Sequence, residues 1–223
     1  MMTVFVVTPY FNTPLAWIRE CHDSVLFQTI PAHHVLVCDG GEPAEIPDFR
    51  GTQVILKRNY ADYGNTPRVI GCYQAAVAGA DAIAFLDADN WFYPDHLEGM
   101  LAHMRDNDLD VGCSTRMLHR LDGSPMIRCP HVNGTDAVDT NCLVVLRSAF
   151  PSLLGWVLHD QDQAGVTDQI LWRILRRMGA RTGFLDRATV AYRTRHRLHY
   201  QIAGETPPPE AVERVDWHGG RYI

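Results

Sequence analysis

Short runs of apolar, often β-branched residues alternate with longer segments of helical periodicity along the first half of the chain. Residues 4–7, 35–38, 54–56 and 82–86 are predicted strands, and their continuous apolar character is typical of strands buried on both faces of a parallel sheet. Between the first two strands, apolar positions at three- and four-residue spacing predict a helix that ends near Pro31. The alternation predicts an α/β fold.

Two further helices are predicted beside the fourth strand. Thr66 and Pro67 have the residue types of an N-cap and a first helical position, and they introduce a helix over residues 69–80. Pro94 opens another helix that reaches about Asn107. The acidic sequence between the fourth strand and Pro94 therefore lies at the end of a buried strand.

The second half of the chain is less regular. Extended segments are predicted at residues 111–118 and 142–146, with a turn at residues 122–123. A last helix follows Thr167 and ends at Gly179, with Arg173, Arg176 and Arg177 turned away from an apolar face made by Ile170, Leu171, Ile174, Leu175 and Met178. We expect a mixed sheet here, and an irregular tail or lid over residues 200–223.

Composition favours one soluble domain over residues 1–223, because 46% of the residues are hydrophobic and no internal repeat is visible. The net charge of -6, from 20 basic and 26 acidic residues, argues against nucleic acid as a partner and against general attraction to an anionic membrane. Recognition of phosphate must then be local. The six cysteines are widely spaced and are expected to be reduced, buried thiols.

No segment has the pattern of a signal peptide or the roughly 20 apolar residues of a membrane span. The expectation is a cytoplasmic protein with no integral membrane segment, whose contact with a membrane, if any, is peripheral. The sequence does not indicate an oligomeric state.

Two carboxylates follow the fourth strand and carry the first chemical hypothesis. Asp87 and Asp89 alternate with Ala88, so in extended backbone both side chains point the same way at the carboxyl edge of the sheet, where open α/β folds bind ligands. Their repulsion would be relieved by a hard cation such as Mg²⁺ or Mn²⁺. The alternative is a solvated turn at Asp89 and Asn90. Asp39 follows another strand and would bring a third carboxylate to this edge.

Five short motifs occur in order along the chain: Thr8-Pro9-Tyr10-Phe11-Asn12, Asp39-Gly40, Pro67-Arg68-Val69-Ile70-Gly71, Phe85-Leu86-Asp87-Ala88-Asp89 and Thr167-Asp168-Gln169. In this order and spacing they resemble the family 2 glycosyltransferases of the GT-A fold, over residues 4–199. The resemblance implies an inverting enzyme that moves a sugar from a nucleotide-diphosphate sugar to a hydroxyl of a sugar, glycan or small-molecule acceptor, with Mn²⁺ or Mg²⁺. It also implies a nucleotide-binding half to about residue 110 and an acceptor-binding half over residues 111–199.

The resemblance assigns the donor site as follows. Asp39 would bind the base, Arg68 the nucleotide or its phosphates, and Asp89 the cation most directly, with Asp87 on the ribose or sharing the cation. The rest of the nucleotide pocket would be formed by Thr8, Pro9, Tyr10 and Ala88. Simple turn roles explain Thr8 and Asp39 as well, and Arg68 is followed by valine where the family more often has asparagine.

Histidines near the end of the chain are candidates for the same site, because many GT-A enzymes add a C-terminal histidine to the metal shell. The resemblance favours His199 as this ligand, with His196 and Arg195 as diphosphate partners. The chain has 11 histidines, and a packing role for either one is the alternative.

Asp168 is the candidate catalytic base, because inverting transfer needs a carboxylate that removes the proton from the attacking hydroxyl. The resemblance places it in the family's acidic helix-start motif, although Thr167 stands where glutamate is more frequent. An aspartate in the first turn of a helix is also favoured by the helix dipole alone. Asp160 and Asp162, just before this helix, are competing candidates.

Contacts to the acceptor or to the donor sugar are expected from Asp139, Asn141 and Trp156, although a strand-entry turn explains the first two equally well and Trp156 can be a packing residue. Two other functions stay open. Metal-dependent nucleotidyl transfer uses similar carboxylates, but it usually needs a glycine-rich basic loop that residues 8–15 lack. The second alternative function is a non-catalytic module of the same fold that binds a nucleotide-sugar.

Overall fold

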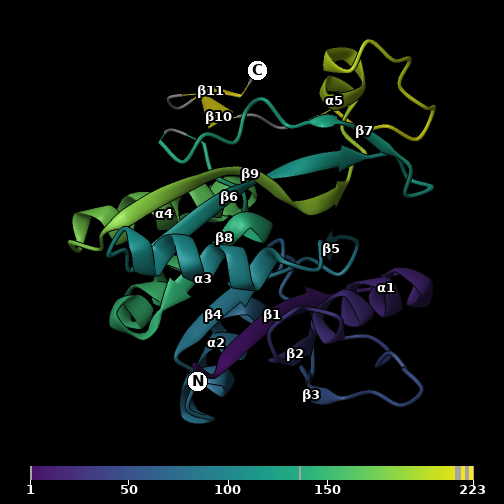
Figure 1. Cartoon of the computed structure of the whole chain (residues 1–223). Coiled ribbons are helices and arrows are strands. Elements are labelled where there is room, and N and C mark those ends of the chain that lie inside the picture. Colours follow the sequence, from purple (N-terminus) through teal and green to yellow (C-terminus); the bar gives the residue numbers. More distant parts are fainter. Residues whose placement is uncertain (1, 136, 214–216, 219–220, 223) are drawn as a thin grey trace.

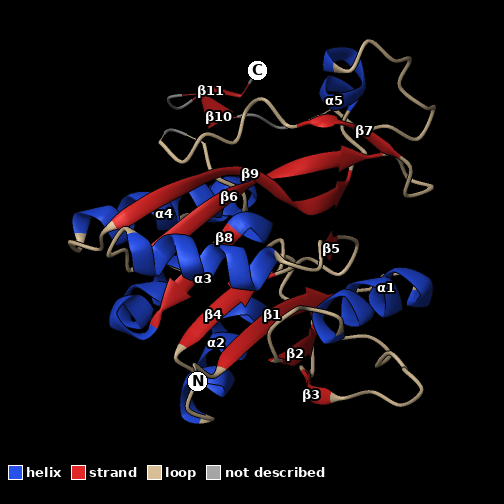
Figure 2. Cartoon of the chain, viewed as in Figure 1, coloured by secondary structure: helices blue, strands red, loops and turns tan. Residues whose placement is uncertain are grey.

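The computed structural model describes residues 2–135, 137–213, 217–218 and 221–222. Within these residues, nine strands form one mixed sheet in the order β3-β2-β1-β4-β8-β6-β9-β5, with β7 paired to β6. Helices cover both faces of this sheet (Figures 1 and 2). The predicted α/β fold class is confirmed.

The sheet strands are β1 (Val4–Tyr10), β2 (Ala32–Cys38), β3 (Gly51–Ile55), β4 (Ala82–Phe85), β5 (Trp91–Phe92), β6 (Val111–His119), β7 (Pro125–Arg128), β8 (Leu143–Leu146) and β9 (Thr182–Arg193), and β10 (Trp217–His218) pairs only with β11 (Arg221–Tyr222). The α-helices are α1 (Leu15–Leu26), α2 (Asn65–Val77), α3 (His96–Asp106), α4 (Thr167–Arg177) and α5 (Arg197–Ile202). Three 3₁₀ segments are η1 (Thr140–Cys142), η2 (Arg147–Trp156) and η3 (Gln161–Val166).

The strands β1 to β4 are parallel, as predicted, but β3 spans residues 51–55 rather than 54–56 and is not buried, because it lies at the edge of the sheet. β1 pairs with β2 on one side and β4 on the other, and β3 extends the sheet beyond β2. All side chains of β1 and β4 are buried. Because parallel strands end at one edge of a sheet, the residues that follow β1, β2 and β4 meet there.

The second half makes the sheet mixed, and β9 is its largest element that the pattern did not predict. β8 is antiparallel to both β4 and β6, whereas β9 runs parallel to β6. Only the last part of β9 is buried, and its first half carries partly exposed and charged positions. Without a continuous apolar run, this 12-residue strand gives a weak sequence signal.

Two details of the predicted helices are wrong. Thr66 is not the N-cap of α2, because the helix begins at Asn65 and the carboxylate of Asp62 accepts hydrogen bonds from the Thr66 amide and hydroxyl at 2.8 and 2.6 Å. On α4, Met178 is 70% exposed and Trp172 is buried in its place, together with Leu171 and Leu175. The buried stripe of α4 is therefore rotated from the one predicted.

The helices divide between the two faces of the sheet. α1 and α3 lie in front of it in Figure 1, and α2, η2 and α4 lie behind. α2 packs closely on β1 at Gly71, where a Cβ atom would lie 2.4 Å from Cγ1 of Val7. This close packing brings the N-terminal turn of α2, with Arg68, to the carboxyl edge of the sheet.

All six cysteines are buried and carry free thiols, as predicted. No helix in the described part of the chain is long and apolar enough to cross a membrane. The start of the predicted irregular tail is ordered, because Tyr200 lies in α5 and Val212 forms a β-bridge with His196, the residue before α5. Residues 214–216, 219–220 and 223 of that tail lie outside the described residues.

Candidate functional site

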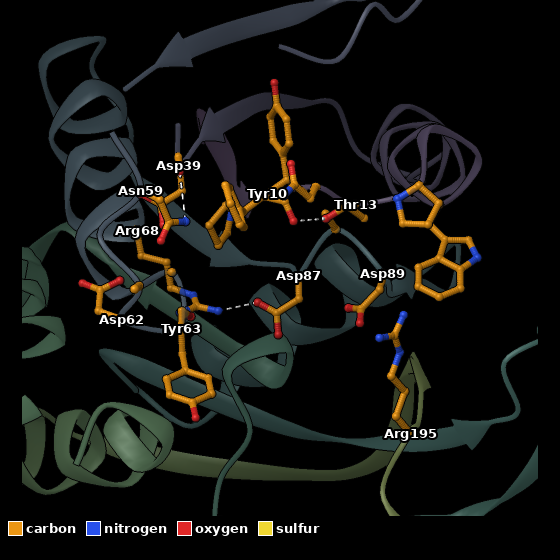
Figure 3. A pocket seen from close by; sticks show the side chains of 18 residues that line it. Tyr10, Thr13, Asp39, Asn59, Asp62, Tyr63, Arg68, Asp87, Asp89 and Arg195 are labelled. Carbon is orange, nitrogen blue, oxygen red and sulfur yellow. Dashed lines mark hydrogen bonds and ion pairs between the residues drawn. The ribbon is translucent and has the colours of Figure 1, made fainter. Parts of the chain in front are cut away.

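Two adjoining cavities open at the carboxyl edge of the parallel strands. The first, about 730 Å³, is lined by the residues after β1, β2 and β4, by the loop of residues 59–64 and by Arg195 (Figure 3). The second, about 620 Å³, lies between the N-terminal turns of α2 and α4. Tyr63, Arg68 and Asp87 line both cavities, so the two share a wall.

Asp39 lies in the first cavity and is held by the loop opposite it. Its carboxylate accepts hydrogen bonds from Asn59 Nδ2 and from the Tyr60 amide, both at 3.1 Å. Burial raises the pKa of this carboxyl, and the bond from Tyr60 opposes that effect. Gly40 allows the loop to approach, because its φ is +78° and a Cβ there would lie 2.5 Å from the Asn59 amide nitrogen. Asp39 therefore presents a fixed acceptor group to the cavity.

The end of β1 contributes two of its three predicted pocket residues. Pro9 and Tyr10 line the first cavity, and the Tyr10 hydroxyl binds Gln53 and the Ala44 amide at 2.6 and 3.0 Å. Thr8 is fully buried and does not line this cavity, because its hydroxyl lies 2.8 Å from Nε2 of His34 on β2. The Thr8 hydroxyl also lies 3.8 Å from Sγ of Cys21 on α1, so Thr8 faces the interior, whereas Pro9 and Tyr10, the last two residues of β1, reach the cavity.

Asp87, which is half-buried, forms an ion pair with the buried Arg68 at the wall between the cavities. The Arg68 guanidinium also donates to the Tyr63 carbonyl at 2.9 Å and lies 5.1 Å from the Trp156 ring. The second oxygen of Asp87 accepts a hydrogen bond from Asn141 at 3.0 Å. Both oxygens of Asp87 therefore have protein partners, as Figure 3 shows for Arg68.

Asp89 has a different environment, although only Ala88 separates it from Asp87. Burial and the neighbouring charge of Asp87 raise the pKa of the Asp89 carboxyl to about 6, while Arg193 and Arg195 oppose the shift. Arg193 donates to the Asp89 carbonyl at 2.6 Å, and the guanidinium of Arg195 points toward Asp89 in Figure 3. The ionised form of the half-buried Asp89 is therefore less stable here than it would be in water.

This donor set fits a hard divalent cation. Asp89 gains most from a cation, and Asp87 can share one only in addition to its present partners. Across the described residues, no group of three or more His, Cys, Asp or Glu side chains is arranged to hold a metal ion. A cation here would therefore need further oxygen ligands from a bound molecule, such as the oxygens of a diphosphate.

The structure does not bring His199 to the cavity that contains Asp89. His199 is fully buried, with Nδ1 at 2.6 Å from the Thr194 hydroxyl and its ring against Tyr192, and it lines neither cavity. His196 lines the second cavity, whereas the exposed Arg195 lines the first. Of the three residues, Arg195 has the placement expected of a diphosphate partner.

Asp168 lies in the second cavity, at the first turn of α4, as the sequence predicts. Its carboxylate accepts a hydrogen bond from the Gln169 amide at 2.8 Å. Asp162 lines the same cavity, whereas Asp160 does not. A hydroxyl bound in this cavity can therefore meet the carboxylate of Asp168 or Asp162.

Trp156 and Asp139 also line the second cavity, but each serves the fold as well. Trp156 is fully buried and packs edge-on against Phe85. Asp139 forms a buried ion pair with Arg116, and its other oxygen accepts hydrogen bonds from the backbone and side chain of Asn141, both at 3.0 Å. The neighbouring carboxylate raises the pKa of Arg116 against the effect of burial. Two other tryptophans, Trp91 and Trp172, line neither cavity and therefore cannot stack on a sugar bound there.

Asn141 joins the two ion pairs rather than lining a cavity. Its amide nitrogen donates to both Asp87 and Asp139, and its amide oxygen accepts from the Asp87 backbone at 2.6 Å and from Asn90 at 3.3 Å. Asn141 is fully buried. Its predicted role as a direct sugar contact does not match this position, and its observed role is to orient Asp87.

Replacing Asn141 with alanine is expected to lower the free energy of unfolding by about 2 to 4 kcal/mol, because four buried or half-buried groups each lose a hydrogen-bond partner. Denaturant unfolding measures this change. Asn133→Ala, in an exposed turn, is the matched control and is expected to change stability by less than about 1 kcal/mol. Equal losses of stability in the two variants would contradict the proposal that the hydrogen bonds of Asn141 connect the two ion pairs.

Several cavity residues have no clear signal in the sequence. The loop before α2 contributes Asn59, Asp62 and Tyr63, and Tyr63 has a φ of +58°. Trp17 on α1 lines the first cavity under Arg195, whose guanidinium carbon lies 5.3 Å from the Trp17 ring. These residues line the cavity because the loop before α2 and the segment with Arg195 fold against the edge of the sheet. No local sequence pattern predicts these tertiary contacts.

Comparison with solved structures shows the fold. S. aureus TarS matches with a TM-score of 0.65 and 16% sequence identity, over 90% of this chain and 38% of that chain. TarS 1-349 in complex with UDP gives the same score and identity, and its complex with UDP-GlcNAc gives 0.63 and 17%. The chain spans less than two thirds of each of these proteins, covering 63% and 59% of the two complexes.

Comparison with known sequences shows the family. No curated protein sequence matches this chain. The family model described as "Glycosyl transferase family 2" matches residues 5–144, which is more than half of the chain and includes Asp39, Arg68, Asp87 and Asp89. The chain therefore has the GT-A fold and belongs to glycosyltransferase family 2.

Proposed function

We propose that this chain transfers a sugar from a nucleotide-diphosphate sugar, bound in the first cavity, to a hydroxyl of an acceptor bound in the second, with inversion at the anomeric carbon. The observation that carries this proposal is the shared wall of the two cavities, formed by Tyr63, Arg68 and Asp87. Such a wall is where the reacting atoms of two bound substrates would meet. Family membership favours glycosyl transfer over nucleotidyl transfer.

In the first cavity, Asp39 would accept a hydrogen bond from an N–H of the base, which suits its fixed position beside Asn59. Asp89, with Asp87, would hold Mn²⁺ or Mg²⁺. The chemistry that such a cation supplies when bound is neutralisation of the charge on the departing diphosphate. Arg195 would add a positive charge at the same end of the cavity.

In the second cavity, Asp168 would act as the general base. The acceptor oxygen forms a bond to the anomeric carbon as the bond between that carbon and the diphosphate oxygen breaks, and the electron pair leaves with the diphosphate. The hydroxyl proton moves to the carboxylate of Asp168. Attack from the face opposite the diphosphate inverts the configuration, which agrees with the base and the leaving group lying in different cavities.

A thermal-shift screen tests the donor assignment. UDP and UDP-GlcNAc are the first ligands to try, because TarS 1-349 was solved with both, and the corresponding guanosine, adenosine and cytidine compounds extend the series. At a ligand concentration near 100 times Kd, we expect Tm to rise by about 5 to 10 °C in the presence of Mn²⁺ and by much less with EDTA.

Turnover then separates an enzyme from a binding module. Slow release of the nucleoside diphosphate from the donor that shifts Tm, dependent on Mn²⁺ and faster with a suitable acceptor, is the expected result. A Tm shift without any release of diphosphate would identify a non-catalytic module. No shift with any nucleotide would overturn the donor site itself.

A further inference from the structure

Six large apolar side chains are exposed on the outer surface of the helical layer behind the sheet. η2 packs against both α2 and α4, so the three elements form one layer, which we call the α2-η2-α4 face (Figure 1). Its exposed apolar residues are Tyr73 (72%), Val77 (68%), Leu154 (57%), Val157 (37%), Leu158 (66%) and Met178 (70%). Apolar exposure gathered on neighbouring elements is typical of an interaction surface.

The exposed apolar side chains of this face belong to stretches of sequence without acidic residues, which are bordered by Asp62, Asp81, Asp160, Asp162 and Asp168. Residues 63–80, 143–159 and 169–185 contain no Asp or Glu, although the whole chain contains 26. The outer side of α4 carries three exposed arginines, at positions 173, 176 and 177. Arg147 and Arg181, at the margins, pair with Asp81 and with Asp108 and Asp110, so they add little net charge.

The opposite helical face has a different composition. Leu26 and Phe27, at the end of α1, are 40% and 75% exposed. They lie among acidic positions, because α1 contains Glu20 and Asp23 and the neighbouring α3 contains Glu98, which accepts a hydrogen bond from Thr29. The three elements of the α2-η2-α4 face contain one acidic residue, Asp168, whereas α1 and α3 contain several.

We propose that the α2-η2-α4 face binds the surface of an anionic lipid bilayer. Interfacial binding combines apolar side chains that enter the boundary of the acyl region with basic side chains that meet the headgroups. The net charge of -6 opposes attraction of the whole chain, but the three elements of this face contain one acidic residue, Asp168, which lines the second cavity. A broad surface with few acidic residues allows close approach to lipid phosphates, and each arginine adds about fivefold to the partition coefficient.

The face ends at the rim of the second cavity. Asn65 at the start of α2 donates to the Thr167 hydroxyl at the start of α4 at 2.9 Å, and both residues line that cavity. A chain bound through this face would therefore hold the cavity between α2 and α4 beside the bilayer. The membrane interaction does not depend on the proposed sugar transfer, and it can be measured without any substrate.

Vesicle cosedimentation tests the proposal directly. Vesicles of phosphatidylcholine alone are compared with vesicles of equal parts phosphatidylcholine and phosphatidylglycerol, at low and at physiological salt. We expect binding to the anionic vesicles that is at least about tenfold tighter than to the neutral ones and that weakens with salt. Binding to neither vesicle, or equal binding to both, would overturn the proposal.

Surface variants assign the binding to this face. Arg176→Glu with Arg177→Glu, and separately Leu154→Ser with Leu158→Ser, are each expected to reduce partitioning about tenfold or more. Phe27→Ser is the matched control on the opposite face and should bind as wild type does. Circular dichroism confirms that each variant is folded.

An equal loss of binding in Phe27→Ser would contradict the assignment. Sedimentation equilibrium tests the alternative that the α2-η2-α4 face binds a second copy of the chain. A dimer in solution that the Leu154→Ser and Leu158→Ser changes abolish, without vesicle binding by wild type, would replace the membrane proposal with self-association.

Discussion

Replacing Asp168 with asparagine is expected to lower the rate of sugar transfer by about 10²- to 10⁴-fold while the affinity for the donor changes by less than about twofold. The amide that replaces the carboxylate cannot accept the proton of the acceptor hydroxyl. Donor affinity should be retained, because Asp168 lines only the second cavity. The loss should therefore fall on kcat, with little change in the KM for the donor.

Asp162 supplies the matched control for this experiment. It lines the same cavity as Asp168, whereas Asp160 lies outside both cavity linings. Asp162→Asn is expected to keep transfer within about tenfold of wild type. Near-normal turnover by Asp168→Asn together with a large loss in Asp162→Asn would move the catalytic base to Asp162. Large losses in both variants, with donor Tm shifts intact, would indicate that the two carboxylates act together.

The Mn²⁺-dependent shift of Tm by UDP gives a second measurement on the Asp168→Asn variant. If Asp168 acts as a base, transfer to the acceptor should fall more than the Mn²⁺-dependent shift of Tm by UDP. A variant that loses both to the same extent would have lost the fold of the cavity rather than a proton acceptor. This distinction separates the catalytic proposal from the donor-binding proposal.

The sequence predicts β1, β2 and β4 well, because these strands are largely buried and their sequences are continuous apolar runs, whereas the edge strand β3 is partly exposed and was predicted three residues late. β1, β2 and β4 lie where residues 4–7, 35–38 and 82–86 predict them. β9 was not predicted, since its partly exposed first half lacks such a run. Local pattern therefore identifies the buried strands and misses one whose stability comes from pairing with β6.

The candidate site was predictable where residues follow a predicted strand or begin a predicted helix. Asp39, Asp87, Asp89 and Asp168 reach the cavities for that reason. Thr8 does not reach the cavity, because its hydroxyl contacts Cys21 and His34 in the interior and only the last two residues of β1, Pro9 and Tyr10, line the cavity.

Other contributions depend on tertiary contacts. Asn141 could be associated with the site from its motif, but its connection to both ion pairs needs the antiparallel return of β8 beside β4. The loop that brings Asn59 to Asp39 likewise has no signal of its own.

Replacing Asp89 with asparagine is expected to weaken Mn²⁺-dependent nucleotide binding by more than about 100-fold. Outer partners of metal ligands contribute about 10- to 100-fold to affinity, and a direct ligand contributes more. Because the cation and a proton compete for this carboxylate, Mn²⁺ affinity of wild type should also fall by up to about tenfold per pH unit below 6, where the Asp89 carboxyl becomes protonated. Calorimetric titration of UDP with and without Mn²⁺ measures both effects.

The same substitution is expected to stabilise the protein in the absence of metal. The Asp89 carboxyl has its pKa raised from 3.8 to about 6, so its favourable contribution to stability is complete below pH 3.8 and is lost as the pH rises through 6. Asparagine does not ionise. In EDTA at pH 8, Asp89→Asn should therefore be more stable to denaturant than wild type by about 1 to 3 kcal/mol, with a difference near zero at pH 4.

Asp87→Asn is the matched comparison, and its effect on stability should have the opposite sign. Asp87 pairs with the buried guanidinium of Arg68 and accepts from Asn141, so removing its charge leaves a buried cation without its counterion. We expect a loss of about 1 to 3 kcal/mol at pH 8. If Asp89→Asn destabilises the metal-free protein as Asp87→Asn does, Asp89 is a paired structural carboxylate. If the two substitutions change stability in opposite directions and Asp89→Asn also loses Mn²⁺-dependent binding, Asp89 is a cation ligand whose charge destabilises the metal-free fold.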